Sequence, residues 1–151
     1  MNRSNILQVE DDDNDVFLLR HAFEKAGITH RLTVARDGEE ALEYLSGDGE
    51  FSDRNHFPLP HLILLDLKMP RRNGLDFLNW LRNESALPHL PVLVLSSSAQ
   101  PGDIGRAYEL GVNAFLVKPA TNSERIRMAA AIKEFWLELN MPPPEASRHS
   151  P

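Results

Sequence analysis

The chain has 151 residues, of which 42% are hydrophobic and 25% charged, a composition typical of one globular domain with a sizeable core. Its formal net charge of −6 argues against binding to nucleic acid or to an anionic membrane, because both require a basic protein surface. The absence of cysteine excludes disulfides and thiolate sites, and no apolar run reaches the roughly 18 residues of a membrane span. Since no signal peptide precedes the first apolar run, we expect a cytoplasmic protein.

The first third of the chain alternates strand-like and helix-like segments. Residues 6–9 form a short apolar run that predicts a strand, and the acidic block 10–15 can cap the helix that follows. Gly27 is suited to end that helix. Residues 32–35 then predict a second strand, and Asp37 predicts the beginning of a second helix.

A long loop and a strongly apolar strand occupy the middle of the chain. Residues 46–60 show little periodicity, which predicts either a recognition element or a tolerated insertion, with Phe51 and Phe57 packed against the domain. Residues 62–65 are four large aliphatic side chains in succession, typical of a strand covered on both faces. Asp66 ends this run abruptly.

The second half of the chain repeats the alternation. A helix follows the turn around Gly74, and residues 92–95 and 114–117 predict two further strands. Between them, Pro101 is suited to begin a helix. We expect that helix to direct three side chains inward: Ile104, Ala107 and Tyr108.

The last predicted helix covers residues 123–139. Its spacing predicts a core face of Ile126, Ala129, Ile132, Trp136 and Leu139. Further apolar residues near its end, Phe135, Leu137 and Met141, suggest packing against more than its own domain. We expect residues 1–141 to form one domain and residues 142–151 a disordered tail.

Five strands alternating with five helices predict an α/β fold with one doubly wound parallel sheet. The flavodoxin-like strand order 2-1-3-4-5 is favoured by right-handed crossovers. In that order the strands ending in Glu10 and Asp11, Asp66, Ser96, and Lys118 are neighbours. Their polar side chains therefore converge at one edge of the sheet.

These polar side chains predict a phosphoryl site. Three clustered carboxylates repel one another and need a cation, and oxygen ligands without nearby histidine or cysteine favour Mg²⁺. A lysine and a serine hydroxyl beside Mg²⁺ would stabilise a phosphoryl group. Asp66 alone could instead be a helix cap. Within the acidic block we assign a role only to Glu10 and Asp11, and we interpret the acids up to Asp15 as solvated capping residues.

Four stretches of the sequence resemble the receiver domains of two-component response regulators. They are Val9-Glu10-Asp11, Leu65-Asp66-Leu67-Lys68-Met69-Pro70 with Gly74, Val94-Leu95-Ser96, and Phe115-Leu116-Val117-Lys118-Pro119. With the alternating layout, the resemblance covers roughly residues 5 to 139.

The resemblance implies a role for each of these residues. Asp66 would accept a phosphoryl group from a sensor histidine kinase, and Mg²⁺ would be held by Glu10, Asp11, Asp66 and the backbone carbonyl of Lys68. Lys118 would pair with the phosphoryl oxygens. Ser96 and Phe115 would form the switch, and the Lys118–Pro119 peptide bond would be cis. Such a protein catalyses only its own phosphorylation and dephosphorylation and is not otherwise an enzyme.

This sequence departs from the common family pattern at four positions. Glu10 stands where Asp is more usual, and Ser96 where Thr is frequent. Phe115 cannot make the hydrogen bond of a Tyr, and Asn73 is neutral at a frequently acidic turn position. Because the carboxylate and hydroxyl chemistry is kept, none of these changes removes phosphoryl acceptance.

The 46–60 loop and the extended last helix resemble the single-domain regulators associated with phytochrome kinases. That resemblance implies a light-sensing histidine kinase as partner and a homodimer through the last helix and the neighbouring face, without nucleic-acid or membrane binding. Phosphorylation would then change partner binding or dimerisation, since no attached output domain is expected.

Three other functions are weaker alternatives. A degenerate receiver acting as a phosphorylation-independent interaction module is disfavoured because every required group is present. A flavin or nucleotide binder would need a glycine-rich phosphate cradle where this chain has acids. A phosphohydrolase would need an acid two residues after its nucleophile, and Lys68 is there.

Overall fold

The computed structural model describes residues 5–69 and 71–143. A single sheet of five parallel strands in the order β2-β1-β3-β4-β5 forms its centre. The strands are β1 (Asn5–Val9), β2 (Arg31–Ala35), β3 (Leu62–Leu65), β4 (Val92–Ser96) and β5 (Ala114–Val117). Both the flavodoxin-like fold and its strand order are as predicted. The tail predicted at residues 142–151 lies almost entirely outside the described residues.

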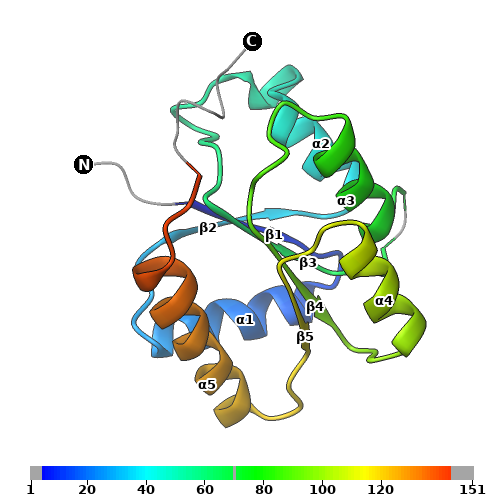
Figure 1. Ribbon diagram of the computed structural model, residues 1–151. Helices are drawn as coiled ribbons and strands as arrows, with labels where there is room; N and C mark the ends of the chain where they lie inside the picture. The colour runs from blue at the N-terminus through cyan, green and yellow to red at the C-terminus, as the bar shows by residue number, and fades with distance from the viewer. Residues whose placement is uncertain (1–4, 70, 144–151) are drawn as a thin grey trace.

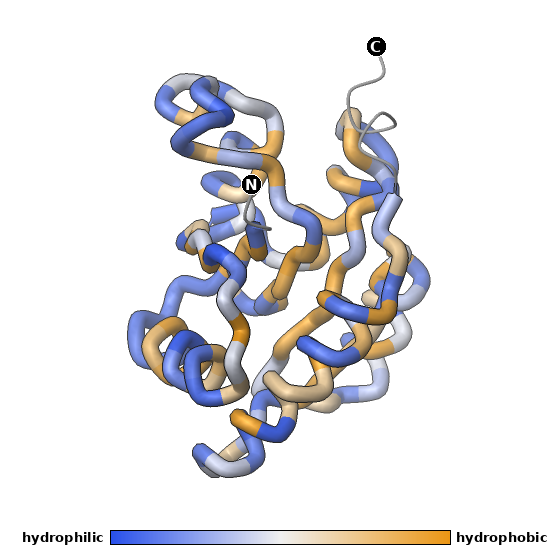
Figure 2. The backbone as a smooth tube through the Cα atoms, turned by 90° about the vertical axis from the view of Figure 1, so that its left-hand side faces the viewer, coloured by the Kyte–Doolittle hydropathy of each residue, from blue (hydrophilic) through white to orange (hydrophobic). Residues whose placement is uncertain are grey.

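Helices cover both faces of the sheet (Figure 1). One face carries α1 (Asp13–Lys25) and α5 (Asn122–Ile132), and the other carries α2 (Gly38–Ser46), α3 (Gly74–Asn83) and α4 (Pro101–Glu109). Two apolar clusters fill the spaces between these layers. The hydrophobic segments accordingly run through the middle of the molecule in Figure 2, with hydrophilic segments outside. No helix in the described part of the chain combines the length and apolar character needed to cross a membrane.

Burial explains why the central strands read as continuous apolar runs. Every residue of β1, β3 and β4 is buried, because helices cover both faces of these strands. Side-chain caps begin the helices between them. Asp12 accepts hydrogen bonds from the Asn14 and Asp15 amides at α1, and Asn73 accepts one from the Asp76 amide at α3. The acidic block thus caps α1 as predicted.

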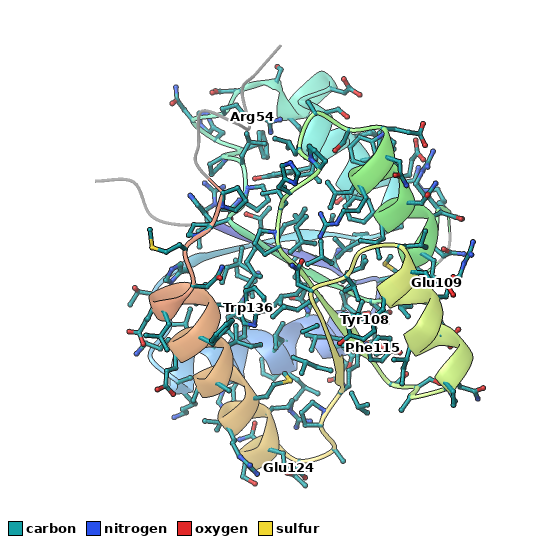
Figure 3. All side chains as sticks on the ribbon, in the orientation of Figure 1. Arg54, Tyr108, Glu109, Phe115, Glu124 and Trp136 are labelled. Carbon is teal, nitrogen blue, oxygen red and sulfur yellow. The ribbon has the colours of Figure 1, made fainter. Side chains whose placement is uncertain are left out.

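The 46–60 loop folds back on α2. It contains a short 3₁₀ helix, η1 (Gly49–Ser52). Phe51 and Phe57 pack against Tyr44 with ring centroids 5.2 and 6.1 Å away, which confirms the predicted packing. Arg54 donates to the carbonyl oxygens of Tyr44 and Leu45 at 2.8 and 2.9 Å, at the top of Figure 3. The loop is therefore a packed part of the domain.

The end of the last helix differs from the prediction. The α-helix stops at Ile132 and continues as a π-helical segment, η2 (Lys133–Leu139). Its wider turns rotate the side chains that follow, so Trp136 and Leu137 pack against the core, whereas Leu139 is 66% exposed. The prediction that Leu139 belongs to the core face is wrong, because it assumed α-helical periodicity to the end.

Candidate functional site

Four strand ends bring the predicted polar side chains together. Backbone hydrogen bonds hold these ends in register: the Asp66 amide donates to the Val9 carbonyl at 3.0 Å, and the Lys118 amide to the Ser96 carbonyl at 2.7 Å. Glu10 follows β1, Asp66 follows β3, Ser96 ends β4 and Lys118 follows β5. The polar residues predicted for the carboxyl edge of the sheet therefore lie at that edge.

Three carboxylates form the acidic part of this edge. Oxygens of Glu10, Asp11 and Asp66 all lie within 4.8 Å of one another. Glu10 and Asp66 are buried, whereas Asp11 is exposed. Three hard oxygen donors open to solvent on one side suit a divalent cation such as Mg²⁺ or Mn²⁺.

Burial disfavours the charged forms of these acids. It raises the pKa of Glu10 to about 7, against the opposing hydrogen bond from Lys118 and with a further upward contribution from the Asp66 charge. The pKa of Asp66 is also raised by burial, although the Lys118 charge and the Lys68 backbone amide oppose the rise. A cation at this edge would relieve both shifts, since it favours ionised carboxylates.

Lys118 is the basic group of the site, and one of its partners, Asp15, was not among the predicted site residues. Its Nζ donates to Glu10 Oε1 at 2.8 Å and to Asp15 Oδ2 at 2.7 Å, and it lies 3.8 Å from Asp66 Oδ1. Burial lowers the pKa of Lys118, but its hydrogen bonds to Asp15 and Glu10 outweigh this effect and raise the pKa overall. The prediction that Asp15 is a solvated capping acid is wrong, because its side chain is only 33% exposed and accepts a hydrogen bond from Lys118. No local pattern in the sequence indicates this contact, because Asp15 and Lys118 lie on elements far apart in the chain.

The predicted cis bond between Lys118 and Pro119 is absent: the described residues contain no cis peptide bond, and this one is trans. A trans bond is also the intrinsically preferred form before proline. Lys118 reaches the acidic edge in this conformation.

Gly74 is required by the close approach of two backbone segments. A Cβ atom on Gly74 would lie 2.4 Å from the carbonyl oxygen of Asp66, which is a collision. The Gly74 amide also donates to the Leu67 carbonyl at 2.9 Å. The turn after Asp66 therefore folds directly over the backbone of the acidic site, and glycine permits this.

The two candidate switch residues lie on β4 and β5. Ser96 is buried and its Oγ accepts a hydrogen bond from the Ser98 amide at 3.2 Å. Phe115 is half-buried against the core, and Figure 3 labels it on β5. Tyr108 is 50% exposed, so the prediction that it faces inward is wrong. In this short helix only Ala107 is fully buried.

A doubly wound parallel sheet with an acidic cluster, a lysine and a hydroxyl at its carboxyl edge has the groups needed to hold a divalent cation beside a phosphoryl group. Comparison with known protein families identifies the type of domain. Residues 6–131 match the response regulator receiver domain. The chain therefore belongs to the response regulator receiver domain family.

Two curated relatives resemble most of the chain. It is 38% identical over 141 residues to the probable methanogenesis regulatory protein FilR2 of Methanothrix harundinacea, covering 91% of this chain and 86% of that protein. It is 36% identical over 133 residues to the response regulator Rcp1 of Synechocystis sp., covering 88% of each.

Solved structures show the same fold. The phosphorylated cyanobacterial phytochrome response regulator RcpA matches with a TM-score of 0.86 at 34% identity, covering 95% of this chain and 100% of that chain. The Mn²⁺-bound form of Rcp1 matches with a TM-score of 0.82 at 35% identity, covering 93% and 99%. Single-domain, phytochrome-associated response regulators are thus among its near relatives.

Proposed function

We propose that this protein is a phosphorylation switch in which Asp66 accepts a phosphoryl group from the phosphohistidine of a sensor kinase. The observation that supports it most strongly is the arrangement around Asp66. Its carboxylate shares the acidic cluster with Glu10 and Asp11 and lies 3.8 Å from the Lys118 ammonium. A nucleophilic carboxylate beside a cation site and a lysine is the arrangement that phosphoryl transfer requires.

Each residue of the cluster has a distinct part in this proposal. Glu10, Asp11, Asp66 and the backbone carbonyl of Lys68 would hold Mg²⁺, which neutralises charge on the transferring phosphoryl group when bound. Lys118 would stabilise the phosphoryl oxygens from the β5 side. The Asp66 carboxylate attacks phosphorus, the bond from phosphorus to the kinase histidine breaks, and that histidine keeps the electron pair.

Ser96 and Phe115 would convert phosphorylation into a change of surface. Ser96 would leave the Ser98 amide for a phosphoryl oxygen, and Phe115 would follow it inward from its half-buried position. Because the Phe115 ring cannot donate a hydrogen bond, packing alone would determine its two positions. The face formed by α4, β5 and α5 would then differ between the two states.

Intact mass measurement after incubation with acetyl phosphate tests the proposed function. With Mg²⁺ we expect a gain of one phosphoryl group, and with excess chelator we expect none, because the clustered carboxylates repel an incoming phosphate without a cation. A phosphorylated sensor histidine kinase, in which the phosphoryl group is on the kinase histidine, serves as the second donor. No gain from either donor would contradict the proposal and favour a phosphorylation-independent interaction module.

We extend the proposal to the partner. A histidine kinase of the phytochrome class, acting in the cytoplasm, is supported by the likeness to RcpA, a cyanobacterial phytochrome response regulator. The receiver unit of residues 1–141 would dock onto this kinase, and phosphorylation would act by altering partner binding.

A homodimer through the end of the last helix is part of the same proposal. Phe135, Leu139 and Met141 form a C-terminal apolar surface, with exposed fractions of 51%, 66% and 88%. Such residues are stabilised when a second copy covers them. Trp136 is unsuited to a test of this idea because it packs against its own core.

Replacing Phe135 and Leu139 with serine is expected to weaken this dimer by about tenfold or more, because each side chain loses apolar burial. Sedimentation velocity across a concentration series measures the effect. Phe17→Ser is the control, since Phe17 is as exposed as Leu139, at 66%, but lies on α1. A wild-type protein that sediments as a monomer with and without phosphorylation would contradict the dimer.

A further inference from the structure

The Lys118 ammonium is engaged by acids other than the phosphoacceptor. An ammonium has three N–H donors, and two of them are used at 2.8 and 2.7 Å by Glu10 and Asp15. The distance of 3.8 Å to Asp66 Oδ1 is too long for a hydrogen bond. In this resting arrangement the lysine is therefore attracted to Asp66 but is bonded elsewhere.

Asp15 differs from the other acids around Lys118. Glu10 and Asp66 belong to the trio that can hold a cation, and Asp15 does not. It lies in the first turn of α1, where its backbone amide donates to the N-cap residue Asp12. Its side chain is one-third exposed and that of Lys118 one-fifth exposed, so water only partly screens this ion pair.

The space beside this pair allows it to open. A cavity of about 50 Å³ lies between α1, β1 and α5, lined by Gln8, Asp15, Lys118, Arg125 and Met128 among others. Because the cavity adjoins both members of the pair, Lys118 can change partner without displacing tightly packed core atoms.

We propose that Asp15 is a positioning residue that holds Lys118 in the resting state and competes for it with a phosphoryl group on Asp66. This inference rests on the proposed function. Phosphorylation would transfer the Lys118 ammonium from the Asp15 carboxylate to a phosphoryl oxygen. The first turn of α1 would thereby lose its link to the β5–α5 connection when the switch is turned on.

The affinity for beryllofluoride, which imitates a phosphoryl group on a carboxylate, tests the competition. In saturating Mg²⁺ we expect Asp15→Asn to lower the dissociation constant about threefold, since a partly exposed ion pair of the resting state is removed. ¹⁹F NMR of the bound species measures it. Asp13→Asn is the matched control, because Asp13 has the same charge in the same helical turn but pairs with Arg36. The control corrects for the general loss of one negative charge.

A second readout uses the metal-free protein. The ¹⁵Nζ and ¹³Cε resonances of Lys118 are expected to shift in Asp15→Asn and to stay unchanged in Asp13→Asn. A merely structural role for Asp15 predicts the opposite effect on affinity: weaker beryllofluoride binding together with a lower Tm.

The outcomes separate this inference from the proposed function. Beryllofluoride binding that is equal in both variants, or weaker in Asp15→Asn, would overturn the role of Asp15 and leave Asp66 as the phosphoacceptor. A wild-type protein that binds no beryllofluoride in Mg²⁺ would overturn the phosphoacceptor proposal itself.

Discussion

Asp66→Asn is expected to abolish phosphorylation completely while leaving the protein folded. The amide of asparagine is a far weaker nucleophile than a carboxylate, so no acyl phosphate forms with acetyl phosphate or with a kinase. Intact mass after incubation with acetyl phosphate and Mg²⁺ measures this directly. Persistence of the phosphoryl adduct in the variant would contradict the assignment of Asp66.

The same substitution is expected to stabilise the metal-free protein. Burial disfavours the Asp66 carboxylate and raises its pKa, and this cost exceeds the attraction of Lys118 at 3.8 Å and is on the order of 1 kcal/mol. Removing the Asp66 charge should therefore raise the Tm by about 3 °C in a chelating buffer. Asp76→Asn is the matched control, because Asp76 is an exposed acid on α3, and it should accept the phosphoryl group as the wild type does.

Lys118→Ala is expected to destabilise the metal-free protein in a pH-dependent way. Lys118 lowers the pKa of buried Glu10, which is already raised from 4.5 to about 7, so its removal raises that pKa further. A folded state that holds a proton more tightly than the unfolded state loses stability as pH rises from about 4.5 through the folded pKa. The stability of the folded variant therefore goes on falling to a higher pH than the stability of the wild type does.

Urea denaturation in chelator at two pH values measures this effect. We expect the free energy of unfolding to fall by about 2 kcal/mol relative to wild type at pH 8, because breaking a partly buried ion pair leaves Glu10 without its cation. At pH 5, where Glu10 is protonated in the folded state, we expect a loss below about 1 kcal/mol. Lys25→Ala removes an exposed lysine from the same fold and serves as the control. An equal loss at both pH values would contradict the proposed electrostatic origin.

Lys118→Ala is also expected to uncouple phosphorylation from its structural response. The variant should still gain one phosphoryl group, since Asp66 and the cation ligands remain. Hydrogen exchange of the α4–β5 region should then be the same with and without phosphorylation, because the ammonium no longer bonds the phosphoryl group. A phosphorylation-dependent change of wild-type size would show that Lys118 is not needed for the response.

Local sequence patterns were sufficient to predict the sheet and its site edge. The aliphatic run before Asp66 predicted a strand buried on both faces, and its residues are buried as expected. Strand order then followed from the handedness of the connections, and the order brought Glu10, Asp11, Asp66 and Lys118 to one edge. These predictions succeeded because burial of apolar runs and the direction of parallel strands are properties of single segments and of their sequence.

Two features were decided by the tertiary structure alone. One is the change from α-helical to π-helical period at the end of the last helix, and the other is the pairing of Lys118 with Asp15. The π-helical segment η2 exposed Leu139 and turned Leu137 to the core, and only packing against neighbouring elements reveals such a change of period. Packing also decides the exposure of Tyr108, which is half-exposed because little of α4 is buried against the sheet. The ion pair between Asp15 and Lys118 joins residues 103 positions apart. A contact of this kind depends on how the first turn of α1 lies against the end of β5, which no local pattern in the sequence specifies.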